Sequence, residues 1–140
     1  MTIKGKKIIV EGNERLLEYF KKNNNILLAT VFGSYVDGSF DYRFSDIDIA
    51  LLFKKHISLL DESAIMSTLS DILNFEKIDL LNLNKANFIL RYKAVIKGKI
   101  LYEVDPEFTD NYIESILNSY RLHYYRYKKM QNEFLQNIGD

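Results

Sequence analysis

The chain has 140 residues, of which 47% are hydrophobic and 27% charged, and its 19 basic and 19 acidic residues cancel. This length fits one domain, residues 1–140, with a hydrophobic core large enough to be stable without disulfides or a structural metal. The charge balance gives no reason to expect an obligatory nucleic-acid partner or a membrane surface. The absence of cysteine excludes disulfides and thiolate metal sites. No apolar run is long enough for a membrane span or a secretory signal, so we expect a cytoplasmic protein.

The first half of the chain predicts one helix followed by two strands. Residues 12–24 have leucine and phenylalanine at helical spacing, with Asn13 as the expected cap. Residues 26–33 are a short apolar run that ends in glycine and indicates a buried strand. Residues 45–53 alternate at first and then become wholly apolar, which is typical of a central strand with one functional end.

The second half predicts helices that alternate with short strands. An amphipathic helix is expected over residues 59–75, a strand over 76–84, a helix over 86–98 that Gly98 stops, and a strand over 99–104. Strands and helices in this order predict an α/β or α+β fold, in which a mixed central sheet is flanked by helices. The predicted core covers residues 12–105.

A long helical pattern begins at Pro106 and runs to about residue 137. At 1.5 Å per residue it would extend roughly 45 Å, which exceeds the span of so small a core. We expect its first half to pack on the sheet and its second half to dock a partner or a second copy of the chain. A helix folded back as two pieces is the alternative. Its apolar stripe comprises Ile113, Ile116, Tyr120, Tyr124, Tyr127, Met130 and Phe134.

Three aspartates occur where the pattern predicts strands. Asp46 and Asp48 are two residues apart, so their side chains point to the same face of a strand, opposite to Ile47 and Ile49. Asp79 lies between apolar residues of another short strand. Carboxylates so close to a core repel each other and lose hydration unless a cation lies between them. If the two strands are neighbours, the three aspartates could bind Mg²⁺ for phosphoryl or nucleotidyl transfer.

A glycine–serine pair precedes these aspartates in the same segment. Gly33 ends a predicted strand and Ser34 opens what could be a short helix. Free backbone N–H groups and the Ser34 hydroxyl at such a turn suit a phosphate, and glycine lets it approach the backbone closely. An ordinary strand-to-helix turn is the alternative for any lone Gly-Ser.

The segment FGSYVDGSFDYRFSDIDIALL, residues 32–52, resembles the DNA polymerase β type of nucleotidyltransferase. That signature is a hydrophobic residue, Gly, Gly or Ser, a spacer, and Asp-x-Asp among hydrophobic residues. Gly38, Ser45 and the later segments KIDLLNL and AVIKGKILYE are similar to the minimal nucleotidyltransferases of bacteria and archaea. The resemblance covers residues 12–105.

The resemblance implies an antitoxin that transfers AMP from ATP to a tyrosine of a helical HEPN toxin, with Mg²⁺. It implies that Asp46, Asp48 and Asp79 bind two metal ions and act in catalysis. Gly33, Ser34 and Ser45 would belong to the nucleotide site, with Ser45 ordering the start of the strand.

One position departs from the family pattern. Asp37 stands before Gly38, where the family often has a basic residue. Arg43 could supply the missing phosphate contact, or it could be an ordinary solvated arginine. An antitoxin that only occludes its partner is therefore the second hypothesis. A small-molecule nucleotidyltransferase is the third, although such enzymes usually carry an additional domain.

Overall fold

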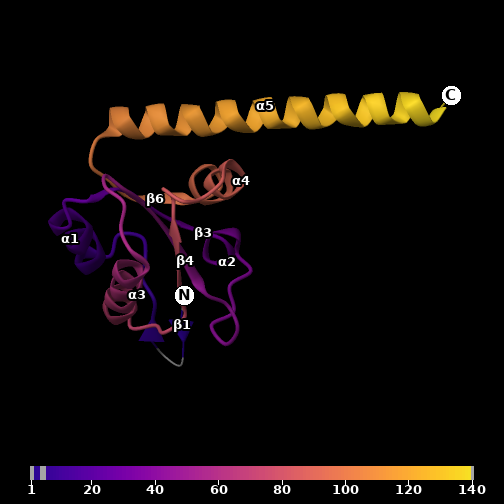
Figure 1. Ribbon diagram of the computed structural model, residues 1–140. Coiled ribbons are helices and arrows are strands. Elements are labelled where there is room, and N and C mark those ends of the chain that lie inside the picture. The colour runs from indigo at the N-terminus through magenta and orange to yellow at the C-terminus, as the bar shows by residue number, and fades with distance from the viewer. Residues whose placement is uncertain (1, 4–5, 140) are drawn as a thin grey trace.

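The computed structural model describes residues 2–3 and 6–139; residues 1, 4–5 and 140 of the predicted domain lie outside the described residues. The element order agrees with the sequence prediction from residue 12 onward (Figure 1). The strands are β1 (Thr2–Ile3), β2 (Lys6–Lys7), β3 (Ile26–Phe32), β4 (Ile47–Phe53), β5 (Ile78–Asn82) and β6 (Lys99–Glu103). The helices are α1 (Glu14–Lys22), α2 (Ser34–Asp37), α3 (Leu59–Leu73), α4 (Phe88–Arg91), the π-helix η1 (Tyr92–Ile96) and α5 (Pro106–Gly139).

The central sheet has four strands in the order β5-β4-β3-β6. β3 pairs antiparallel with both β4 and β6, whereas β4 and β5 are parallel and α3 connects them. The predicted mixed sheet is therefore confirmed. β1 and β2 form a separate two-stranded ribbon that the sequence analysis did not predict, because strands of two residues have too few positions to show a period.

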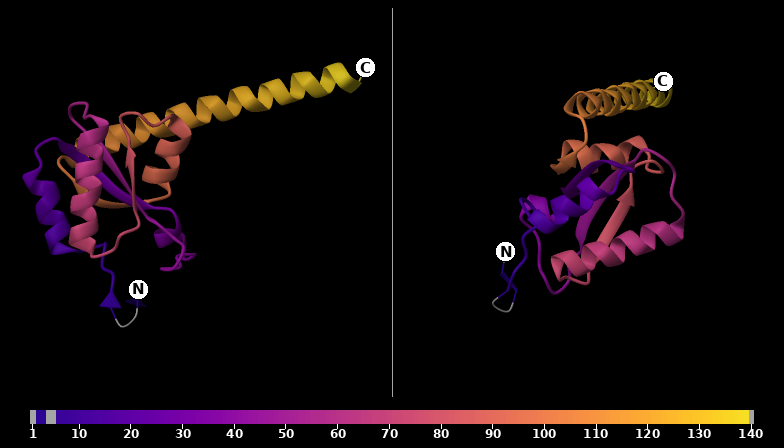
Figure 2. Two further views of the ribbon diagram at one scale, coloured as in Figure 1. Left: turned by 60° about the horizontal axis from the view of Figure 1, so that its bottom comes forward. Right: turned by 90° about the vertical axis from the view of Figure 1, so that its left-hand side faces the viewer.

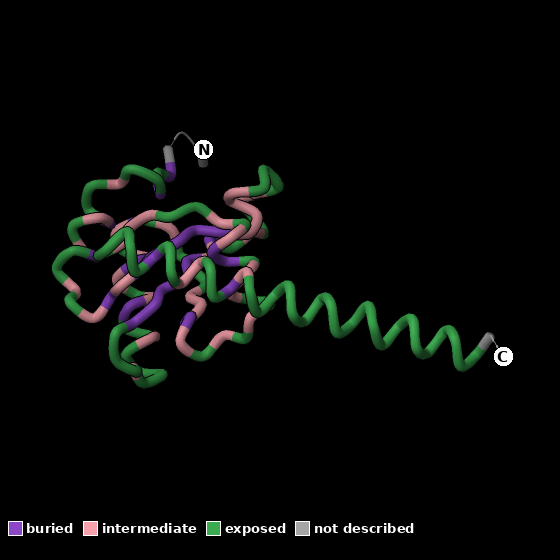
Figure 3. The backbone as a smooth tube through the Cα atoms, turned by 90° about the horizontal axis from the view of Figure 1, so that it is seen from above, coloured by how far each residue is buried: buried purple, intermediate pink, exposed green. Residues whose placement is uncertain are grey.

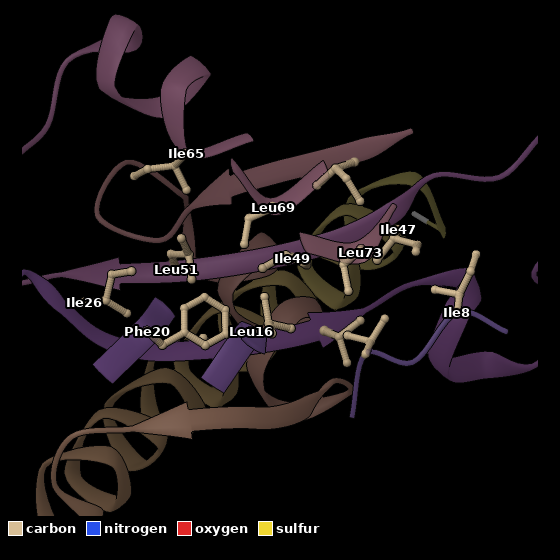
Figure 4. Packing of buried hydrophobic residues seen from close by; sticks show 14 of the residues in the cluster. Ile8, Leu16, Phe20, Ile26, Ile47, Ile49, Leu51, Ile65, Leu69 and Leu73 are labelled. Atoms are coloured by element: carbon tan, nitrogen blue, oxygen red, sulfur yellow. The ribbon is translucent and has the colours of Figure 1, made fainter. Parts of the chain in front are cut away.

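One face of the sheet packs against α1 and α3 (Figure 2). Asn13 caps α1 by accepting a hydrogen bond from the backbone N–H of Leu16, as predicted. Figure 4 shows the core on this face, to which α1, α3, β3 and β4 all contribute. The labelled members are Ile8, Leu16, Phe20, Ile26, Ile47, Ile49, Leu51, Ile65, Leu69 and Leu73.

The opposite face packs against η1 and the start of α5, and α4 packs on both of these helices. The predicted helix over residues 86–98 is present only in part, since its α-helical turn gives way to η1 after Arg91. Gly98 follows this helix, but not as a left-handed cap. A Cβ on Gly98 would lie 2.1 Å from the Ala94 carbonyl oxygen and 2.8 Å from that of Val31, so glycine allows η1 to approach β3 closely.

α5 is one continuous helix of 34 residues, about 51 Å long, so the alternative of two folded pieces is wrong (Figure 3). Its first part packs on α4 and η1, and Ile116 reaches the core that β3 and β4 share. Tyr120 stacks on Tyr92 and His123 lies against Phe88, with ring centroids 4.0 and 4.5 Å apart. Every residue from 118 to 138 is exposed, including Tyr120 and His123 of this contact. Within residues 2–3 and 6–139, no helix combines the length and apolarity needed to cross a bilayer.

Candidate active site

Two of the three predicted carboxylates lie on neighbouring strands, and the third directly precedes one of them. β4 and β5 pair so that Asp48 and Asp79 are direct partners, on strands whose backbones are about 4.8 Å apart. The apolar neighbours Ile47 and Ile49 face the α1–α3 side, which leaves Asp48 on the side of η1. Asp46 lies one residue before β4, which begins at Ile47 rather than at Ser45 as predicted. The condition set in the sequence analysis, that the two strands are neighbours, is therefore met for Asp48 and Asp79.

Asp48 is the aspartate of this cluster whose pKa is clearly raised. Burial raises its pKa to about 6, and the charges of Asp79 and Asp46 add to that rise. The positive charge of Lys93 opposes it. Ionisation of Asp48 therefore costs more free energy here than in water, and a bound cation would offset that cost.

Gly33 joins the turn after β3 to this cluster. Its φ of 74° and ψ of −146° belong to a backbone region that is essentially restricted to glycine. An added Cβ would lie only 2.2 Å from Asp48 Oδ2, so a side chain here would displace the carboxylate. The backbone N–H groups of Val36 and Asp37 donate to the Gly33 carbonyl and close the turn that Ser34 opens. The turn and Asp48 are thus parts of one site.

The loop from Gly38 to Asp46 is organised around Asp41. The Ser45 hydroxyl accepts a hydrogen bond from the Asp41 backbone N–H at 2.9 Å, and the Ser45 N–H donates to the Asp41 carbonyl at 2.7 Å. Ser45 therefore orders the chain before β4. The Arg43 guanidinium is paired with the Asp41 carboxylate at 3.1 Å and lies over the Phe44 ring. In this arrangement Arg43 stabilises the loop. Its predicted contact with a phosphate would require the ion pair between Arg43 and Asp41 to break.

Asp37 is engaged within its own turn. Its Oδ1 accepts hydrogen bonds from the Ser39 hydroxyl at 2.5 Å and from the Ser39 backbone N–H at 2.9 Å. These bonds hold the pKa of Asp37 below its usual value, and the charge of Lys93 lowers it further. The carboxylate at the position that departs from the family pattern is therefore ionised and fixed beside Gly38.

Lys93 is the residue near this site that the sequence analysis missed. It lies in η1, on the face of the sheet that carries Asp48, and its charge acts on both Asp48 and Asp37. In the sequence it looks like an ordinary solvated lysine of a helical segment. No spacing rule could have singled it out, because its neighbours at the site are 45 and 56 residues away in the chain.

The donor set suits a hard divalent cation. Asp46, Asp48 and Asp79 offer only carboxylate oxygens, which Mg²⁺ prefers, and the raised pKa of Asp48 indicates negative charge in need of compensation. Among residues 2–3 and 6–139, no three acidic or histidine side chains already surround one point. Mg²⁺ commonly takes one or two carboxylates and completes its shell with substrate phosphates and water, so these residues fit the ion.

Comparison with known proteins identifies a family model that matches most of the chain. The model described as "Polymerase beta, Nucleotidyltransferase" matches residues 14–107, the segment that holds the sheet and all three aspartates. No curated protein matches the chain as a relative.

Several solved structures share the fold. A chain of a toxin–antitoxin complex with AMP-PNP has a TM-score of 0.71 and 21% identity, over 89% of this chain and 98% of that one. A chain of an MntA-HepT toxin–antitoxin complex has a TM-score of 0.66 and 18% identity, over 88% and 96%. A chain of a complex of the tri-AMPylated Shewanella oneidensis HEPN toxin with MNT antitoxin has a TM-score of 0.66 and 19% identity, over 88% and 95%.

Proposed function

Because the chain belongs to the polymerase beta nucleotidyltransferase family, we propose that it transfers AMP from ATP to a protein hydroxyl in a Mg²⁺-dependent reaction. The observation that carries this proposal is the pairing of Asp48 with Asp79 beside Gly33. Carboxylates on adjacent strands, next to a turn that only glycine can form, supply the two parts that such a reaction needs. One part is a cation site and the other is a place where phosphates can approach the backbone.

Each residue has a definite role in this proposal. Asp46, Asp48 and Asp79 would hold Mg²⁺, which would neutralise the charges of the phosphates. Gly33 and Ser34 would hold the outer phosphates, so that the α-phosphorus lies in line with the acceptor oxygen. Asp79 would accept the proton of the attacking hydroxyl. The new bond forms between that oxygen and the α-phosphorus, and the bond to pyrophosphate breaks.

A tyrosine of a HEPN-type toxin is the acceptor that we propose. Support comes from the fold neighbours, one of which is described as a complex with a tri-AMPylated HEPN toxin. The exposed part of α5 offers a docking surface for such a partner, with Tyr124, Tyr127, Met130 and Phe134 all more than half exposed. A second copy of the chain is the other occupant that this surface could take.

Label transfer from α-³²P-ATP to the product of the neighbouring gene tests the proposal. Wild-type protein with Mg²⁺ should label the partner, whereas Asp46→Ala/Asp48→Ala should not. Chelation of the metal should abolish labelling by the wild type. Absence of labelling by wild type and double variant alike would refute the enzymatic proposal.

An antitoxin that acts by binding alone is the second candidate, and the exposed half of α5 favours it. The double aspartate variant separates the two candidates. It should still neutralise the toxin if occlusion suffices, and it should fail if transfer of AMP is required.

A further inference from the structure

We propose that Lys93 is a triphosphate-binding residue of this site, which it enters from η1 across the sheet face opposite to α3. This inference rests on the proposed use of ATP and names a residue that holds that substrate. Three features of the structure support it: the attachment of η1 to β3, the negative groups on which the charge of Lys93 acts, and the partners of the other nearby cations.

η1 is fastened to β3 beside Lys93. The buried Thr30 hydroxyl donates a hydrogen bond to the Ala94 carbonyl at 2.8 Å. Gly98 brings the same segment against the backbone of Val31. Val31 and Thr30 pair with Ile49 and Ala50 of β4, the residues directly after Asp48. The backbone of Lys93 is therefore held rigidly next to the strand that carries the aspartates, as binding residues need to be.

The segment that carries Lys93 is a π-helix. Such turns are rare, and they occur often at functional sites, because the extra residue in the turn re-aims a side chain. Here the change from α4 to η1 takes place at Tyr92, directly before Lys93. Ala94 and Val95 on the following positions are buried, whereas Lys93 is exposed. Its ammonium group is thus directed away from the core on a fixed backbone.

The charge of Lys93 acts on both halves of the candidate site. Its charge lowers the pKa of Asp48 on the carboxylate side and, after the hydrogen bonds from Ser39, that of Asp37 on the side of the Gly33–Gly38 turn. A triphosphate that spans from the turn to the carboxylates would occupy the space between these groups. A single cation that acts on both sides is placed to meet its oxygens.

Neighbouring cations have other partners. Arg43 is paired with Asp41, and the Lys77 ammonium donates to the Arg43 carbonyl oxygen. Lys93 forms no ion pair with any residue whose side chain the structure describes. Asp46, Asp48, Asp79 and Asp37 make this region strongly negative, so a polyphosphate needs a positive side chain here in addition to Mg²⁺.

Isothermal titration calorimetry with ATP, ADP and AMP, each with Mg²⁺ and without an acceptor protein, tests the inference. Lys93→Gln should weaken ATP binding about ten- to hundredfold, as expected for a lost charged hydrogen bond. It should change AMP binding by less than about threefold, because AMP lacks the outer phosphates. Lys93→Arg should restore most of the ATP affinity. Lys97→Gln, a matched exposed lysine one turn away, should leave ATP binding unchanged.

The outcomes distinguish this inference from the proposed function. Wild-type protein that binds ATP as tightly as Lys93→Gln overturns the role of Lys93 alone, and so does an equal loss of ATP and AMP affinity. Wild-type protein that binds no nucleotide overturns both. If the wild type binds ATP with the predicted dependence on Lys93 but labels no partner, only the proposed transfer reaction fails. Equal thermal unfolding of wild type and Lys93→Gln confirms that any loss is local.

Discussion

Gly33→Ala is the substitution that most directly tests whether the turn after β3 and Asp48 form one unit. A Cβ at this position would lie 2.2 Å from Asp48 Oδ2 and 3.2 Å from Asp48 Cγ, well inside contact distance. The backbone adds a second cost, because φ of 74° with ψ of −146° is strained for any residue with a side chain.

The steric cost and the backbone cost can be estimated one at a time. Backbone strain of this kind costs about 1–3 kcal/mol. Moving the Asp48 carboxylate off its preferred rotamer adds about 0.5–1.5 kcal/mol. We therefore expect Gly33→Ala to lower the free energy of unfolding by about 1.5–4.5 kcal/mol, the sum of the two. A carboxylate displaced by an ångström should also reduce nucleotide transfer about a hundredfold.

Urea denaturation with two companion variants measures these terms. Gly12→Ala is the matched control, since Gly12 has φ of 72° but no atom within 4 Å of an added Cβ. It should cost about 1–2 kcal/mol and leave transfer intact. Gly33→Ala introduced into an Asp48→Ala background should lose only the backbone term, because the carboxylate is gone. An equal cost of Gly33→Ala in both backgrounds would refute the reasoning that the turn is shaped around Asp48.

Three further predictions concern charge, the attachment of η1, and α5. Asp48 has its pKa raised from 3.8 to about 6, so its ionisation opposes folding. The free energy of unfolding of the wild type should fall from pH 4 to pH 6 relative to that of Asp48→Asn. At pH 7.5 the variant should be more stable by about 1 kcal/mol, a figure reduced because solvent screens the half-buried carboxylate. Urea denaturation at each pH measures both values. Thr30→Val should lower the free energy of unfolding by about 1–3 kcal/mol, because it leaves the Ala94 carbonyl without its buried donor. Thr68→Val removes an exposed hydroxyl from a similar bond and should lower it by no more than about 0.5 kcal/mol in the same assay. A chain that ends at Tyr120 should keep core stability within about 1 kcal/mol but lose toxin neutralisation in a growth assay, and retained neutralisation would argue against α5 as the docking surface.

Local patterns in the sequence were enough to predict most helices and strands and the face on which Asp48 and Asp79 lie. The alternation of Asp48 with Ile47 and Ile49 sets that face, because a strand has a period of two whatever it packs against. The Asn13 cap and the long C-terminal helix follow from equally local rules. Gly33 was likewise recognisable as the end of a strand next to a serine.

Only the tertiary structure decided how these pieces meet. The parallel pairing of Asp48 with Asp79 depends on which strand adds to β4, and 30 residues of intervening chain separate the two. The steric relation of Gly33 to Asp48 and the closeness of Gly98 to Val31 are contacts across strands, which no period in the sequence encodes. The position of Lys93 near the site likewise depends on contacts between distant segments. Its place beside the carboxylates results from the packing of η1 on β3, and packing is a property of the whole fold rather than of any one segment.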